Sequence, residues 1–219
     1  GITLVAEVLP KEKRGFGTTN VAAFGICGAV LAAQIAKAFD WRTAYFIGGG
    51  LGLALLVLRV SVFESSMFAA VKEKVKSRGN FLALFHPWSR LKRYLACIFI
   101  GVPIWYVIGI LITLSPEFAR NMGVTEEVSP GNAVMYAYIG LALGDLTSGL
   151  ISQLIRSRRK VVLLFLGLVI VCVATYLTRS ATTAETIYLL CMGLGFATGY
   201  WAIFVTIAAE QFGTNLRAT

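Results

Sequence analysis

The sequence has few charged residues for its length. Charged residues make up 14% of the 219 residues, whereas hydrophobic residues make up 57%, and the mean hydropathy is +0.75. A soluble domain carries about 25% charged residues. The shortage of charge therefore excludes an ordinary soluble domain. It predicts an all-α membrane protein with several spans, in direct contact with the lipid bilayer.

Histidine and metal-ligand motifs are also scarce. His86 is the only histidine, which argues against a histidine-based metal site or a Ser-His pair. The glycine-rich run at 48–52 lies inside an apolar span and no Lys-Ser/Thr follows it, so it does not predict a phosphate-binding loop. We therefore expect no metal, no cofactor and no enzymatic activity. The cysteines lie in apolar stretches without CxxC spacing and are predicted to be packing residues: Cys27, Cys97, Cys172 and Cys191.

The net charge of +9 comes from basic residues that lie between apolar runs. In a soluble protein such a charge would suggest nucleic acid as a partner, but here the cytoplasmic side of a membrane explains it. We expect no nucleic-acid partner. Each apolar run is close to the roughly 20 residues that cross a bilayer. The runs predict spans at Thr18–Phe39, Thr43–Phe63, Tyr94–Leu114, Ala133–Ile155, Val161–Leu177 and Ile187–Ala209.

Lys and Arg are concentrated on one side of these spans. The other side has only Lys37, Arg42, Arg120 and Arg179. Because cytoplasmic loops carry an excess of Lys and Arg, the basic side is expected to be cytoplasmic, in a plasma (inner) membrane. The long loop 64–93 falls on this side, and its first part has the pattern of an amphipathic helix on the membrane surface. We interpret it as a connector between two bundles, with a partner-binding surface as the alternative.

A short motif occurs near both ends of the chain. Residues 6–15 read Ala-Glu-Val-Leu-Pro-Lys-Glu-Lys-Arg-Gly, and residues 209–218 read Ala-Glu-Gln-Phe-Gly-Thr-Asn-Leu-Arg-Ala. Each copy follows an apolar run and places six residues between a Glu and an Arg. Two such copies on either side of a membrane domain indicate an internal repeat.

The repeated motif resembles the Glu-x6-Arg loop signature of the major facilitator superfamily, in particular its sugar-porter, aromatic-acid:proton and organic-ion branches. The turn Asp40-Trp41-Arg42 and the segment 149–160 resemble further signatures of the same family. The resemblance implies a polytopic helix bundle with this family's fold, seen from the end of helix four to the start of helix eleven. The lack of an initiating Met also leads us to expect a central segment of a longer protein. The implied divisions are 1–63, the end of an N-terminal six-helix bundle; 64–93, a cytoplasmic linker; and 94–219, the first four helices of a C-terminal bundle.

The resemblance also implies a cytoplasmic gate, in which charges at helix ends lock that side in the outward-open state. Gln153 stands where the family has a signature Asp, and one residue is inserted before Arg158. The second-half gate is therefore expected to be weaker, or to take its acid from elsewhere. The alternative is that such surface pairs contribute about 0–1 kcal/mol and only orient loops. The candidate gate residues are Glu7, Arg14, Gly149, Gln153, Arg158, Arg159, Glu210 and Arg217.

Asp145 is the acid that lies deepest in a predicted span. A charge at such a position costs about 3 kcal/mol, so it usually faces an aqueous cavity or a partner. We hypothesise that Asp145 binds a proton or a cationic group of a solute. A structural hydrogen bond to a neighbouring helix is the alternative. Small residues recur every four positions on the same span, at Gly140, Gly144, Ser148 and Ser152, which predicts either a sliding seam against the other half or plain close packing.

The helices that would line a central cavity carry aromatic and polar residues. Rings with polar tips suit sugars, aromatic acids or organic cations. For each aromatic residue alone, packing against lipid is an equally good explanation. The cavity candidates are Gln34, Trp105, Tyr106, Thr198, Tyr200 and Trp201.

Taken together, the sequence predicts a secondary transporter. It would move a small polar or organic-ion solute by alternating access, with a proton or another ion as the coupling partner. The alternative from another class is a transporter-like receptor or scaffold that signals through the loop 64–93. Membrane-embedded catalysis would need a reactive pair that this sequence does not contain.

Overall fold

The computed structural model describes residues 14–60, 85–178 and 183–212, and these residues form helices joined by short turns. In this part of the chain, six helical stretches are long and apolar enough to cross a membrane. They agree with the predicted spans to within a few residues, except that Trp88–Ile112 begins earlier than predicted. The stretches are Asn20–Ala38, Trp41–Leu58, Trp88–Ile112, Pro130–Ile155, Arg158–Thr178 and Ala184–Ala208.

Two of these stretches are not single regular helices. The third consists of a helix that continues into a wider π-helical turn, and the last consists of two helices separated by a break. The elements are α2 (Arg14–Ala38), α3 (Trp41–Val60), α5 (Trp88–Tyr106), the π turn η2 (Val107–Ile112), α6 (Ser115–Asn121), α7 (Pro130–Ile155), α8 (Arg158–Thr178), α9 (Ala184–Ala197) and α10 (Trp201–Gln211).

Local sequence signals explain where several helices begin. Asp40 precedes α3, and its carboxylate accepts hydrogen bonds from the Thr43 hydroxyl at 2.6 Å and from the Arg42 amide at 3.1 Å. The bond from Thr43 lowers the pKa of Asp40, so this N-cap stays ionised at neutral pH. Pro130 is the first residue of α7, where a missing N–H costs nothing. The short helix α6 has Pro116 in its first turn, and Leu114 precedes it.

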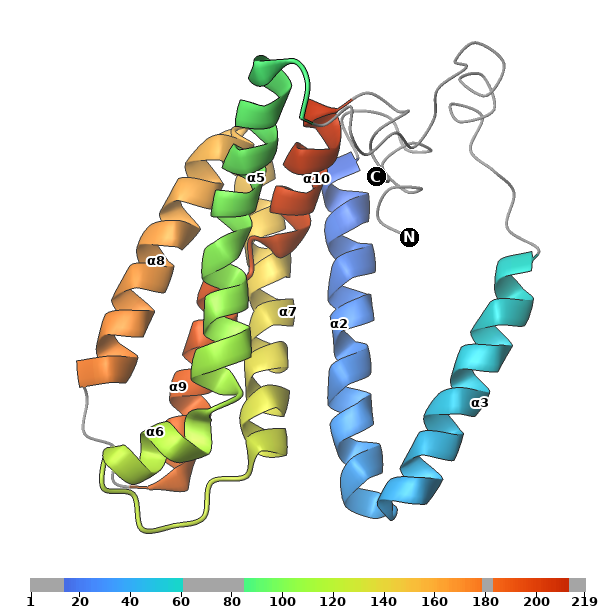
Figure 1. Cartoon of the computed structure of the whole chain (residues 1–219), viewed down its shortest axis with the longest axis vertical. Coiled ribbons are helices and arrows are strands. Elements are labelled where there is room, and N and C mark those ends of the chain that lie inside the picture. The colour runs from blue at the N-terminus through green and yellow to red at the C-terminus, as the bar shows by residue number, and fades with distance from the viewer. Residues whose placement is uncertain (1–13, 61–84, 179–182, 213–219) are drawn as a thin grey trace.

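The core lies among α5, η2, α7, α8 and α9–α10, which pack around one another in Figure 1. Val107 and Leu111 of the π turn are fully buried there, together with Tyr176 of α8 and Ile187 of α9. The opposite side of α7 packs against α2, whereas α3 makes its main contact with α2 and leans away from the bundle. None of the α3 residues from Trp41 to Leu58 is buried. Their apolar side chains suit contact with lipid.

Candidate transport site

A seam of glycine backbone joins α7 to α9. A Cβ atom added to Gly144 would lie 2.9 Å from the Cα of Gly199, and one added to Gly195 would overlap the backbone of Ala137. Such contacts leave no room for any side chain, and helices approach this closely only at small residues. The glycines of α7 therefore face α9, which supports close packing within one bundle rather than a sliding seam. The α7–α9 seam comprises Gly140, Gly144, Gly195 and Gly199.

The helix that forms this seam stops at Ala197 and resumes at Trp201. Thr198 turns its hydroxyl back onto the Gly195 carbonyl at 2.8 Å, and the Tyr200 amide donates to the Thr198 carbonyl at 2.8 Å. The residues of the break are fully buried. The start of α10 thus presents amide groups inside the bundle, where water cannot satisfy them.

Asp145 of α7 satisfies one of these amides. Its side chain is fully buried, and its Oδ1 atom accepts a hydrogen bond from the Ala202 amide at 3.1 Å. Ala202 is the second residue of α10, so the carboxylate acts as an N-cap supplied by another helix. The partial positive charge at a helix N-terminus favours an ionised carboxylate there. The structural hydrogen bond considered for Asp145 is therefore present.

The second carboxylate oxygen of Asp145 is in a different situation. Oδ2 is buried and has no hydrogen-bond partner among the described residues. The Ser148 hydroxyl donates to the Asp145 backbone carbonyl at 3.0 Å and not to the carboxylate. A buried charged oxygen without a donor carries a large desolvation cost. Asp145 consequently combines one hydrogen bond to α10 with one buried oxygen that has no donor in the described part of the chain.

Three of the cavity candidates meet in a groove between α5 and α10. The groove has a volume of about 530 Å³ and is almost entirely apolar. The rings of Trp105 and Trp201 meet edge to face, with centroids 5.7 Å apart, and Phe204 packs next to Trp201 at 5.9 Å. We call this the aromatic groove; it is lined by Cys97, Ile98, Gly101, Val102, Trp105, Tyr106, Ile110, Trp201 and Phe204.

The other cavity candidates lie outside the aromatic groove. Thr198 is used in the helix break, and the Tyr200 hydroxyl donates to the Ile100 carbonyl of α5 at 2.9 Å. Gln34 of α2 directs its amide at the Met135 sulfur of α7, at 3.2 Å. Tyr200 and Gln34 therefore join helices to one another, with Gln34 at the contact between α2 and α7, whereas Thr198 bonds within its own segment.

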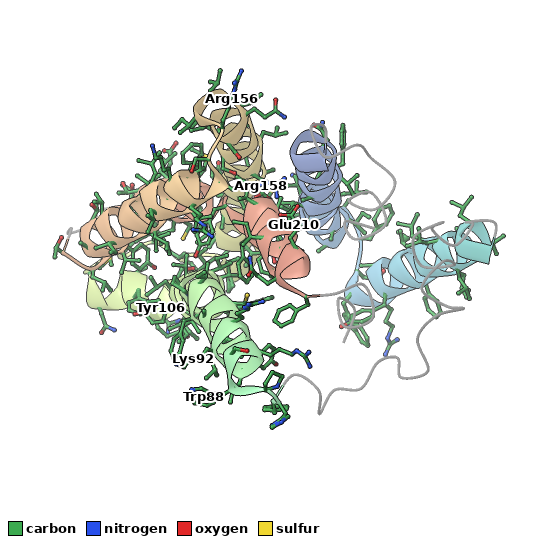
Figure 2. The ribbon with its side chains drawn as sticks, turned by 90° about the horizontal axis from the view of Figure 1, so that it is seen from above. Trp88, Lys92, Tyr106, Arg156, Arg158 and Glu210 are labelled. Carbon is green, nitrogen blue, oxygen red and sulfur yellow. The ribbon has the colours of Figure 1, made fainter. Side chains whose placement is uncertain are left out.

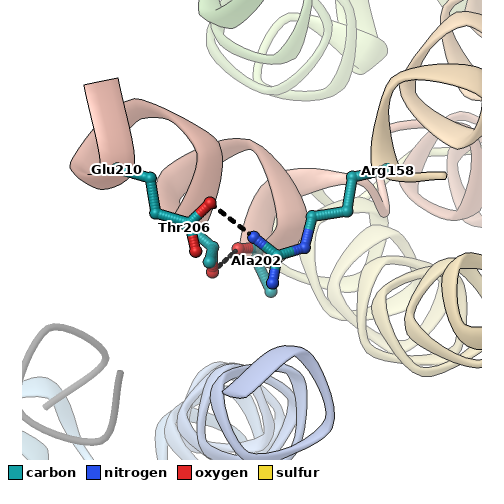
Figure 3. Close-up of polar contacts among 4 residues, drawn as sticks. All are labelled: Arg158, Ala202, Thr206 and Glu210. Carbon is teal, nitrogen blue, oxygen red and sulfur yellow. Dashed lines mark hydrogen bonds and ion pairs between the residues drawn. The ribbon is translucent and has the colours of Figure 1, made fainter. Parts of the chain in front are cut away.

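One of the expected gate pairs forms at the end of the bundle shown in Figure 2. Arg158, the first residue of α8, makes an ion pair with Glu210 near the end of α10, with 2.7 Å between Nη1 and Oε2. Figure 3 shows this pair one turn beyond Thr206, whose hydroxyl donates to the Ala202 carbonyl at 2.8 Å. In the described part of this end, Glu210 is the acid that pairs with Arg158.

The remaining gate candidates take no part in this pair. Gln153 and Arg159 are exposed, and Gly149 is buried within α7. Glu7, Arg217 and the side chain of Arg14 lie outside the described residues.

The sequence singled out Asp145 as a candidate, but it did not predict that this residue binds the Ala202 amide. The break in the last span falls within an apolar run that contains no proline. Its local signal is the pair Thr198-Gly199, because both residue types weaken a helix interior. Nothing in the sequence linked this pair to a carboxylate 50 or so positions earlier, since that link depends on the register of the α7–α9 seam.

The fold and the composition define a class of protein. The long apolar helices make this chain part of an integral membrane protein. The family model of the Major Facilitator Superfamily matches residues 1–219. The chain belongs to this family.

Two curated relatives agree with that assignment. A probable 4-methylmuconolactone transporter of Cupriavidus pinatubonensis is 27% identical over all of this chain and 52% of its own length. The sialic acid transporter NanX of Escherichia coli is 25% identical over 98% of this chain and 53% of its own length. The chain thus spans about half the length of the curated relatives it matches. No solved structure matches it significantly.

Proposed function

We propose that this chain is part of a secondary transporter that moves a small polar or organic-ion solute by alternating access, in symport with a proton. The observation that carries the proposal is the position of Asp145. It is a fully buried acid that binds the first turn of α10, and the same turn supplies Trp201 to the aromatic groove. Ionisable residues inside membrane spans usually mark solute and proton pathways.

The aromatic groove is proposed to hold the ring or apolar part of the solute. Its walls offer large aromatic faces and few polar groups, so they favour a solute with a ring over a fully hydroxylated one. The two relatives are named for 4-methylmuconolactone and for sialic acid. These names make small organic acids and lactones the first solutes to test.

The ion pair between Arg158 and Glu210 is proposed to help close the cytoplasmic end in the outward-open state. Its half-exposed side chains can separate at small cost, which suits a contact that is made and broken in turn. Glu7 with Arg14, and Arg217 with Glu210, are proposed as further parts of this gate. In this proposal the loop 64–93 is a cytoplasmic linker in a plasma membrane protein, between the two bundles that the resemblance implies.

The test uses the full-length protein in proteoliposomes. Uptake of organic acids, lactones and sugars is measured with and without an inward proton gradient, for the wild type and for Asp145→Asn. We expect uptake of at least one solute to be driven by the gradient, and this drive to be lost in Asp145→Asn. Ser148→Ala is the matched control, because it removes a buried hydroxyl from the same face of α7 and leaves the carboxylate in place.

Two results would contradict the proposal. Gradient-driven uptake that persists in Asp145→Asn would remove Asp145 from the coupling pathway. Solute binding without any flux would favour a receptor or scaffold instead. Nothing in the described residues favours that alternative, because most of the loop on which it depends lies outside them.

A further inference from the structure

We propose that Asp145 is a positioning residue for Trp201, and that proton exchange at Asp145 is transmitted to the aromatic groove through the first turn of α10. The inference rests on the proposed function, since it explains how a proton and a solute could be coupled. It concerns a physical link between two parts of the site that the chain brings together from separate spans.

The link begins with the hydrogen bond between Asp145 and Ala202. An ionised carboxylate makes a charge-assisted bond to an amide, which is about twice as strong as the bond made by a neutral carboxyl group. A proton that arrives from water and binds Oδ2 leaves Oδ1 as a neutral acceptor. The cap on α10 is then weaker, and it regains its strength when the proton leaves.

The α7–α9 seam determines whether α7 or α10 moves when the bond between Asp145 and Ala202 weakens. Gly144 and Gly199 hold the two backbones in contact directly before Asp145 on one helix and directly before Tyr200 on the other. Asp145 therefore cannot follow α10 by shifting along α9. A change in the strength of the cap must be taken up by the first turn of α10, beyond the break.

Trp201 is the residue that this turn carries into the groove. It directly precedes Ala202, and its ring makes the edge-to-face contact with Trp105 and the contact with Phe204. A small rotation of the first turn of α10 would reorient this ring. The floor of the aromatic groove would then depend on whether Asp145 carries a proton.

The other ionisable groups nearest to the break on α10 have partners elsewhere. Tyr200 is nearest in sequence to the break, but its hydroxyl is directed at Ile100 of α5. Glu210 lies two turns further along α10 and is paired with Arg158. The titratable or charged residues of the elements packed against α7, and of α7 itself, are Arg14, Cys27 and Lys37 on α2; Glu117 and Arg120 on α6; Tyr136 and Tyr138 on α7; Arg158, Arg159, Lys160, Cys172 and Tyr176 on α8; Glu185, Tyr188 and Cys191 on α9; and Glu210 on α10.

The experiment follows Trp201 directly and does not depend on transport. The full-length protein is labelled with 5-fluorotryptophan in lipid nanodiscs, and the Trp201 fluorine resonance is identified by its loss in Trp201→Phe. We expect this resonance to shift with pH in the wild type. We expect the shift to be lost in Asp145→Asn, which keeps an acceptor for the Ala202 amide but cannot exchange a proton.

A second variant changes the amide donor of the bond between Asp145 and Ala202 and keeps the carboxylate. Ala202→Pro removes the Ala202 amide that the carboxylate binds, within the first turn of α10. Because proline also constrains the residue before it, the Trp201 resonance of this variant is first compared with the wild type at one pH. We expect the pH response of Trp201 to be lost in this variant as well. Ser148→Ala is the control and should respond to pH as the wild type does.

The outcomes separate this inference from the proposed function. A Trp201 resonance that does not respond to pH in the wild type, or that responds equally in Asp145→Asn, overturns the inference even if the protein transports. If the response is present and depends on Asp145 while no solute is taken up by proteoliposomes, the link stands and the transport proposal fails.

Discussion

Buried tyrosines support the irregular backbone of the α5–η2 span. Pro103 removes one helix hydrogen bond from α5, and the π turn follows directly after it. Tyr176 of α8 donates its hydroxyl to the Leu111 carbonyl at 3.1 Å, and Tyr200 donates to the Ile100 carbonyl at 2.9 Å. Inside a membrane, such side-chain donors replace the bonds that an irregular helix cannot make by itself.

Replacing Tyr176 with phenylalanine should therefore reduce stability without changing the fold. The Tyr176→Phe variant keeps the ring in the core and leaves the Leu111 carbonyl without this donor. We expect the free energy of unfolding to fall by about 1 kcal/mol, as measured by denaturant titration in mixed micelles. The control is Tyr45→Phe, because Tyr45 is 79% exposed. An equal loss in both variants would show that the hydrogen bond is not the cause.

At the scale of elements, the α7–α9 seam should be the contact least tolerant of substitution. Adding one methyl group at Gly195 forces the backbones of α7 and α9 apart. Overpacking of this kind costs about 1–3 kcal/mol or more, so Gly195→Ala should lower the thermal midpoint of the purified protein. Gly193→Ala on the same helix is the matched control, since a Cβ there meets nothing within 4 Å. If Gly195→Ala leaves the thermal midpoint unchanged, the backbones of α7 and α9 can move apart without cost.

The ion pair between Arg158 and Glu210 should affect conformation more than stability. Its side chains are 27% and 42% exposed, so its removal should change the free energy of unfolding by no more than about 1 kcal/mol. Arg158→Glu should nevertheless increase the access of a thiol reagent to the end of the bundle at which this pair lies. The exchange Arg158→Glu with Glu210→Arg should restore the wild-type access.

Arg159→Glu provides the comparison for that experiment. It makes the same change of charge at the neighbouring position, which is exposed and lies outside the pair. If Arg159→Glu increases the access of the reagent as much as Arg158→Glu does, net charge rather than the pair controls access.

The sequence predicted most of the spans to within a few residues because each is an apolar run of nearly the length that crosses a bilayer; local signals at helix starts were not used in that prediction. Asp40 and Pro130 are examples of such signals, and the apolar runs fixed the number of spans in the described part of the chain. The break after Ala197 was not predicted: the pair Thr198-Gly199 is a weak local signal, and the carboxylate that caps α10 beyond the break lies on another helix. The backbone hydrogen bonds of Thr198 and Tyr200 were not predicted either, because they depend on how the chain folds around the break.

At the scale of the whole molecule, the aromatic groove should set the preference for solutes. Trp105 is 61% exposed in the groove wall, so Trp105→Ala removes a ring face without emptying the core. Ring contacts of this kind contribute about 0.5–1.5 kcal/mol, and we expect KM for a ring-bearing solute to rise roughly two- to tenfold. Uptake kinetics in proteoliposomes would measure this change.

Trp41→Ala is the matched control for the groove. Trp41 is also exposed and also packs against another ring, that of Tyr45, but it lies between α2 and α3. Equal effects of Trp41→Ala and Trp105→Ala on KM would place solute binding elsewhere. A rise in KM caused by Trp105→Ala that is confined to solutes with rings would support the groove as their binding surface.

The seam between α7 and α9 also limits how this protein can vary over generations. Most of a membrane helix can exchange one apolar side chain for another, because lipid accepts any of them. A contact made of backbone has no side chain to exchange, so Gly140, Gly144, Gly195 and Gly199 can change only by losing the contact itself. New solute preferences would therefore be expected to arise at the walls of the groove, while these positions pass unchanged from ancestor to descendant.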